Sequence, residues 1–109
     1  MMPIAKELIR VYETGETTVI GFGDGEMPDQ IDIPAMRDEI VELLKQHQST
    51  GIAVDLTGVP YVPSAMLGLL ASLKKSGYAV HLYNPSQNVR RVLEVTRLNR
   101  LFQLHDLGI

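Results

Sequence analysis

The clearest pattern in the sequence is a buried strand that leads through a proline-rich turn into a helix, over residues 51–70. Residues 52–56 are mostly apolar with little polar alternation, which is typical of a strand covered on both faces. Pro60 and Pro63 exclude a helix between them, because each proline drives the preceding residue to an extended conformation. Pro63 is predicted to occupy the first helical position. The buried face of this helix is marked by apolar residues at helical spacing: Met66, Leu69, Leu70 and Leu73.

The other elements alternate in the same way along the chain. Further strands are expected over residues 6–13, 17–22 and 79–83. Helices are expected over residues 34–48, 64–76 and 87–96, with Asp32 or Ile33 as the first cap and Ser86 as the last. Inward positions of the first and last helices are predicted to be Met36, Ile40, Leu43, Leu44, Val89, Val92 and Leu93. Residues 104–109 are left unassigned.

This order, β-β-α-β-α-β-α, predicts one α/β domain that spans residues 1–109. Strands that alternate with helices pair in parallel through crossover connections, so most of the sheet is parallel. The turn at Thr14–Gly15 joins the first two strands into an antiparallel hairpin. We therefore expect a mixed sheet of about four strands with packed helices. The turn after residue 56 lies at the carboxyl end of a central strand, where such sheets usually bind ligands and partners.

The central segment resembles the STAS domain of bacterial anti-sigma factor antagonists. The resemblance rests on V-D-L-T-G-V-P-Y-V followed by x-S-x-x-L-G-L-L, and on V-H-L-Y-N-P-S-Q-N-V-R-R-V-L-E-V-T-R-L-N-R-L-F near the end of the chain. It covers residues 6–104. It implies the STAS fold and a non-enzymatic module that binds other proteins.

The family's phosphorylation motif is largely missing from this sequence. In the family the turn reads Asp-Ser-Ser/Thr-Gly, and the second hydroxyl residue is phosphorylated. Here these four positions hold Pro63, Ser64, Ala65 and Met66. The resemblance therefore implies that the usual phosphoserine switch is lost. Ser64 stays as the one candidate phosphoacceptor, at a helix start where a phosphate would be stabilised.

The resemblance also implies a partner and a surface. The partner would be an anti-sigma factor of the serine-kinase type, which the protein would sequester to regulate transcription. The alternative is a cytoplasmic STAS subunit that regulates or assembles a membrane transporter, where the acceptor motif is often missing. The implied partner-binding residues are Pro63, Ser64, Ala65 and Met66, with Asp38 and Glu42 as a flanking acidic surface.

Composition and charge narrow the function further. The chain has no Cys and no apolar run of about 18 residues, so disulfides, cysteine zinc sites and membrane insertion are not expected. The N-terminus lacks the apolar core of a signal peptide, which favours a cytoplasmic protein. The net charge of −3 divides unevenly, with −7 over residues 1–73 and +4 over residues 74–109. Aromatic residues do not alternate with the basic ones, so nucleic-acid binding is not expected. The sequence leaves open whether the protein forms a homo-oligomer.

Neither an enzyme nor a cofactor is predicted. Ser64 is a nucleophile only by position, and the sequence places none of His47, His81 and His105 beside it. Asp55 is expected to accept backbone N–H bonds in the following turn instead of acting as an acid or base. The acidic loop at residues 23–33 lacks the EF-hand spacing, so it is interpreted as a solvated loop and no metal is predicted.

Ser64, Gly68 and Ser72 form a line of small residues on the predicted helix. They lie four residues apart, so they share one helix face. Two interpretations stay open. The line either packs tightly on a neighbouring helix of the same domain or receives a helix of a partner.

Overall fold

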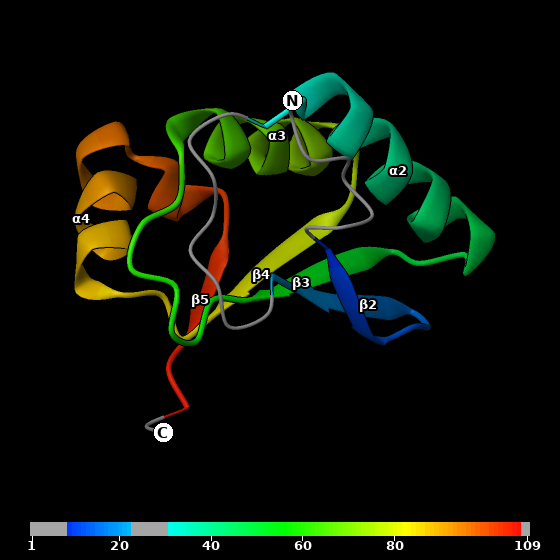
Figure 1. Ribbon diagram of the computed structural model, residues 1–109, viewed down its shortest axis with the longest axis horizontal. Helices are drawn as coiled ribbons and strands as arrows, with labels where there is room; N and C mark the ends of the chain where they lie inside the picture. The colour runs from blue at the N-terminus through cyan, green and yellow to red at the C-terminus, as the bar shows by residue number, and fades with distance from the viewer. Residues whose placement is uncertain (1–8, 23–30, 108–109) are drawn as a thin grey trace.

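Five strands form one mixed sheet in the spatial order β1-β2-β3-β4-β5 (Figure 1). The computed structural model describes residues 9–22 and 31–107. β1 pairs antiparallel with β2, whereas the later neighbours pair in parallel. The strands are β1 (Arg10–Glu13), β2 (Thr17–Gly21), β3 (Gly51–Asp55), β4 (Ala79–Tyr83) and β5 (Gln103–His105). The predicted α/β class and the N-terminal hairpin are confirmed.

In the described part of the chain, three helices pack side by side on one face of this sheet (Figure 1). They are α2 (Ile33–Gln46), α3 (Ser64–Lys75) and α4 (Gln87–Thr96), and a 3₁₀ turn, η1 (Leu98–Arg100), follows α4. Two of their starts are capped as the sequence predicts. The Asp32 carboxylate accepts from Ala35 N at 3.0 Å, and the Ser86 hydroxyl accepts from Val89 N at 3.1 Å. Each cap satisfies a backbone donor that the helix leaves free.

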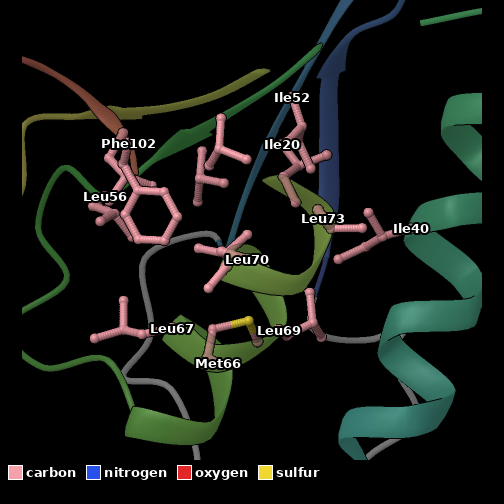
Figure 2. Packing of buried hydrophobic residues seen from close by; sticks show 14 of the residues in the cluster. Ile20, Ile40, Ile52, Leu56, Met66, Leu67, Leu69, Leu70, Leu73 and Phe102 are labelled. Carbon is pink, nitrogen blue, oxygen red and sulfur yellow. The ribbon is translucent and has the colours of Figure 1, made fainter. Parts of the chain in front are cut away.

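The core lies between the helices and the inner face of the sheet (Figure 2). Its residues form one contiguous cluster, to which the sheet contributes Ile20, Ile52, Val54, Val80 and Leu82. Met36, Ile40 and Leu44 of α2 are buried as predicted, and Leu43 is half-buried. The inward placement of Val92 is wrong, because this side chain is 38% exposed. α4 ends the helical layer, so only the stripe with Val89 and Leu93 faces the core.

The outer face of the sheet is not covered by any helix among the described residues. The predicted burial of the central strand is confirmed, but its predicted cover on both faces is wrong. Ala53 points to the outer face and is still only 2% exposed. Its register partners Val19 and His81, on the two neighbouring strands, carry larger side chains that flank it. Ala53 is thus buried by the side chains beside it in the sheet, and not by a helix. For this reason the sequence of β3 has the apolar pattern of a strand that is covered on both faces.

The two ends of the chain differ most from the prediction. β5 lies partly in the segment that was left unassigned, and it pairs in parallel with β4. Three residues are too few to show a periodic pattern, so the strand is defined only by its pairing. The first strand was predicted from residue 6, and residues 6–8 lie outside the described part. The same holds for most of the acidic loop, residues 23–30.

Two buried hydroxyls connect β2 with the loop between α2 and β3. Thr18 and Ser49 are 0% and 8% exposed, and their oxygens lie 2.7 Å apart. The Ser49 hydroxyl donates to the Gly15 carbonyl, so the Thr18 hydroxyl donates to Ser49.

This chain of bonds predicts an order of mutational costs. Ser49→Ala leaves both the Thr18 hydroxyl and the Gly15 carbonyl without their partner, and should lower the free energy of unfolding by about 1–3 kcal/mol. Thr18→Val keeps the bond from Ser49 to Gly15 and should cost about 1 kcal/mol. Urea unfolding of both variants measures the order. A larger loss in Thr18→Val would contradict it.

Candidate functional site

The segment after β3 begins with a tight turn. Leu56 N donates to the Tyr83 carbonyl at 2.9 Å, and Val59 N donates to the Leu56 carbonyl at 3.0 Å. Gly58 is the third residue of this turn and has a φ of +78°. A positive φ at that position defines a type II turn and favours glycine. The chain therefore reverses sharply as it leaves the sheet.

Asp55 stabilises this turn from the end of β3. One of its carboxylate oxygens accepts from Thr57 N at 2.9 Å and from the Thr57 hydroxyl at 2.6 Å. This confirms the prediction that Asp55 accepts a backbone N–H bond there. Its role in the described structure is to fix the loop.

The proline segment is tied to the start of α4. The Ser86 hydroxyl donates to the Pro60 carbonyl at 2.8 Å while it also caps α4. Val59 is buried, whereas Tyr61 is 68% exposed. Burial of Val59 fixes the position of the loop, and the exposed Tyr61 gives it an aromatic surface.

Pro63 is the cap of α3, not its first helical residue as predicted. Its φ of −57° suits either position, but its ψ of 143° is extended. Its carbonyl accepts from Met66 N at 2.9 Å and from Leu67 N at 3.2 Å. The helix thus begins at Ser64, where the predicted range begins, and Pro63 precedes it.

The start of α3 presents small side chains to solvent. Ser64 and Ala65 are exposed, and no side chain caps the helix. Gly68 is also exposed, and a Cβ atom built on it meets no atom within 4 Å. Pro63, Ser64, Ala65 and Gly68 are called the α3 surface below. Within the described structure, Gly68 therefore does not pack on a neighbouring helix, whereas Ser72, at the other end of the small-residue line, bonds to Arg37 of α2.

Met66 does not belong to the α3 surface. Its side chain is 1% exposed and points into the core (Figure 2). It shares the inward stripe of α3 with Leu69, Leu70 and Leu73, at helical spacing. The predicted place of Met66 on the buried face of the helix is confirmed, so its side chain is not available for the implied partner contact. Its position in the motif is adjacent to Ala65, but the helix turns it to the opposite side.

Asp38 and Glu42 are exposed on α2 but do not lie at the start of α3. Arg37 donates to Ser72 at 3.2 Å and to Ser76 at 3.4 Å, so the first turns of α2 lie beside the end of α3. Twelve residues of helix separate Ser64 from Ser76, which is about 18 Å. The structure thus places the α3 surface and the two acidic residues near opposite ends of α3.

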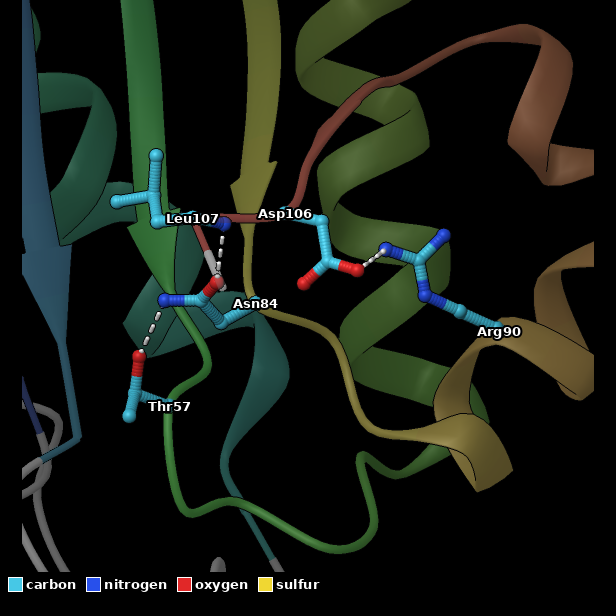
Figure 3. A network of polar contacts seen from close by, with 5 residues as sticks. All are labelled: Thr57, Asn84, Arg90, Asp106 and Leu107. Carbon is cyan, nitrogen blue, oxygen red and sulfur yellow. Dashed lines mark hydrogen bonds and ion pairs between the residues drawn. The ribbon is translucent and has the colours of Figure 1, made fainter. Parts of the chain in front are cut away.

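A polar network connects the segments that follow β3, β4 and β5 at the carboxyl edge of the sheet (Figure 3). Asn84 donates to the Thr57 hydroxyl at 2.9 Å and accepts from Leu107 N at 2.8 Å. Arg90 and Asp106 form an ion pair at 3.4 Å beside it. No pattern in the sequence predicted this network. A usable signal was Asn84 in a turn, because asparagine tolerates the left-handed conformation, here with a φ of +54°.

Two histidines that the sequence left apart lie together on the outer face of the sheet. His81 Nδ1 and His105 Nε2 are 2.9 Å apart, and the His105 ring also stacks on Tyr83 at 4.5 Å. His81 and Tyr83 line a hollow of about 520 Å³, together with Asp55. Burial and the neighbouring His105 lower the pKa of His81 below its ordinary value of 6.5.

The histidine pair predicts a loss of stability on acidification. Because the pKa of His81 is lower in the folded state, the unfolded chain binds more protons below pH 6.5. The free energy of unfolding should therefore fall as the pH drops below 6.5, and level off below the folded pKa.

Urea unfolding from about pH 7.5 to about pH 5 measures this slope. His81→Gln should reduce it, and His47→Gln, which removes a histidine outside the pair, is the control. An equal reduction in the two variants would contradict the assignment to His81.

The described residues show no assembled catalytic or metal centre. Within them, no serine or threonine hydroxyl hydrogen-bonds to a histidine, and no three His, Asp or Glu side chains are placed to hold a metal ion. In this part of the chain, every helix is too short or too polar to cross a membrane.

Comparisons with known proteins fit this geometry. The family model described as "Mlab, STAS domain" matches residues 25–105. The crystal structure of a proposed anti-sigma factor antagonist from Thermotoga maritima superposes with a TM-score of 0.70. The two sequences are 19% identical, over 97% of this chain and 92% of that one. No curated protein matches the sequence. The domain match covers most of the chain, including the turn after β3 and all of α3, and the protein therefore belongs to the STAS domain family.

Proposed function

We propose that the protein is a binding module of the anti-sigma factor antagonist type, whose α3 surface docks on an anti-sigma factor. The observation that carries this proposal is the exposed strip of Ser64, Ala65 and Gly68, with no described atom close to a Cβ built on Gly68. Small side chains let the backbone of a partner helix approach closely. The anchored proline loop leads into the strip and exposes Tyr61, and exposed aromatic residues often dominate binding energy.

Binding would sequester the anti-sigma factor in the cytoplasm and so release its sigma factor, without turnover by this protein. The geometry of the hydroxyls supports a non-enzymatic role. Ser64 is exposed and lies in the first turn of α3, while His81 and His105 bond to each other on the outer face of the sheet. A nucleophile needs a base within hydrogen-bond reach.

The phosphorylation switch of the family would not operate here in its usual form. The acceptor position holds Ala65, which is exposed but has no hydroxyl, and the carboxylate position holds Pro63. Ser64 is the nearest hydroxyl, at the positive end of the α3 dipole. A phosphate there would place about two negative charges on the α3 surface and oppose docking.

The experiment combines binding and mass measurement. The protein is titrated with the serine-kinase anti-sigma factor from the same genome, and its mass is determined after incubation with that kinase and ATP. We expect a stoichiometric complex and an unchanged mass. A gain of one phosphate, lost in Ser64→Ala, would show that the switch has moved by one residue. A failure to bind would contradict the proposed partner.

A second candidate, a cytoplasmic subunit that regulates or assembles a membrane transporter, is favoured by the loss of the acceptor at Ala65. Affinity purification of the tagged protein from its own cells separates the two functions. Recovery of an anti-sigma factor supports the first. Recovery of transporter subunits, with loss of binding in Gly68→Arg, would assign the α3 surface to the second.

A further inference from the structure

A groove with an acidic rim runs between β1 and α2. Its volume is about 420 Å³. Ile9, Val11 and Leu43 supply apolar lining, and Glu39 and Glu42 supply carboxylates. These five residues are called the acidic groove. Val11 is 47% exposed, so apolar surface stays in contact with water there. Such a groove, apolar inside and charged at the rim, fits an amphipathic helix with basic residues.

A ridge of exposed valines with one exposed arginine runs along α4, next to the exposed Glu94. Val95 is 79% exposed and Val92 is 38% exposed, although both are apolar. Arg91 is also exposed, and it shares a helix face with Val95 because the two are four residues apart. Arg91, Val92 and Val95 are called the basic ridge. The core does not need these valines, since the buried stripe of α4 consists of Val89 and Leu93.

We propose that the basic ridge of one copy docks into the acidic groove of a second copy. Val92 and Val95 would contact the apolar lining, and Arg91 would pair with Glu39 and Glu42. Among the described residues the one ion pair joins Arg90 to Asp106, so the charges of the ridge and of the groove have no partner within that part of the chain.

The basic ridge and the acidic groove are too far apart to meet within one molecule, so the contact requires a second one. α2 and α4 lie at opposite ends of the helical layer, with α3 between them (Figure 1). One copy therefore cannot fill its own groove. A contact between two different surfaces is head-to-tail, so it continues into an open chain or closes into a ring. The division of charge along the sequence, −7 over residues 1–73 and +4 over residues 74–109, orients this encounter.

Charge reversal on each side provides the test. The groove variant carries Glu39→Arg and Glu42→Arg, and the ridge variant carries Arg91→Glu. Matched controls are Glu16→Arg, in the turn after β1, and Lys74→Glu, at the end of α3, because both residues are exposed outside the groove and the ridge. Analytical ultracentrifugation over a range of concentrations at low salt measures the mass.

For the wild type and both controls, we expect the mass to rise above 12.1 kDa with concentration, and high salt should reverse this. Each charge-reversal variant alone should associate about ten-fold more weakly, because like charges then meet. The decisive sample is an equal mixture of the two variants. Each groove now faces a ridge of opposite charge on the other variant, so the mixture should recover association.

A monomer at every concentration, or a mixture that does not associate, would overturn the inference and leave the groove to another basic partner. Equal losses in the controls would also overturn it. The ridge variant Arg91→Glu alters neither the α3 surface nor Asp38 and Glu42, so its titration with the anti-sigma factor should be unchanged. The two proposals can thus fail separately.

Discussion

Gly68→Arg is expected to abolish binding of the partner while the domain stays folded. Gly68 lies in the middle of α3 on the exposed strip, and a Cβ at this position meets no atom within 4 Å. The new side chain therefore has room among the described residues of the domain. It would occupy the space that a docked partner helix needs, and small residues in such strips allow close approach of two backbones.

The stability of the same variant should rise. Glycine inside a helix costs about 0.8–1.0 kcal/mol relative to alanine, and arginine is among the better helix formers. The free energy of unfolding should therefore increase by about 0.5–1 kcal/mol. Affinity should fall by about 30-fold or more, as for a central position of an interface. Opposite changes in stability and affinity separate a blocked surface from a damaged fold.

Titration calorimetry with the anti-sigma factor and urea unfolding give the two quantities. Glu16→Arg, an exposed position in the turn after β1, is the matched control and should bind as the wild type does. Gly68→Ala should stabilise the helix by a similar amount with a smaller loss of affinity. Normal binding by Gly68→Arg would show that the partner does not dock on the α3 surface.

The order of helices and strands could be predicted because local sequence signals mark most of them. Asp32 and Ser86 mark two helix starts by their capping groups, and Gly77, with a φ of +107°, follows the end of α3. The apolar stripes of the helices also have a clear period. β5 gave no such signal, because three residues do not define a period and the pairing with β4 is a tertiary contact.

The candidate site could be predicted only in part, since a motif fixes positions in sequence and not directions in space. Pro63, Ser64 and Ala65 lie at the exposed start of α3, but the next residue, Met66, faces the core. Asp38 was placed near this start on the family's pattern, and the bond from Arg37 to Ser76 puts it near the other end of α3. The crossing of two helices depends on packing that no local pattern contains.

Met66→Gly, which restores the family's glycine, is expected to be strongly destabilising. Met66 is 1% exposed and packs in the cluster beside Leu69 and Leu70 (Figure 2). Truncation of a buried methionine costs about 2–5 kcal/mol, and glycine in a helix adds about 1 kcal/mol. A domain of this size has about 5–15 kcal/mol of stability, so a large fraction would be lost.

Ala65→Ser, which restores the hydroxyl of the same motif, should change the free energy of unfolding by less than about 0.5 kcal/mol, because Ala65 is exposed. Met66→Leu preserves volume and should cost less than about 1.5 kcal/mol. Urea unfolding midpoints of the three variants give the comparison. A mild effect of Met66→Gly would mean that Met66 is not part of the core. The expected result means that the Met66 side chain is needed for core packing. Restoring the family's glycine at this position would then require other core residues around Leu70 to change as well.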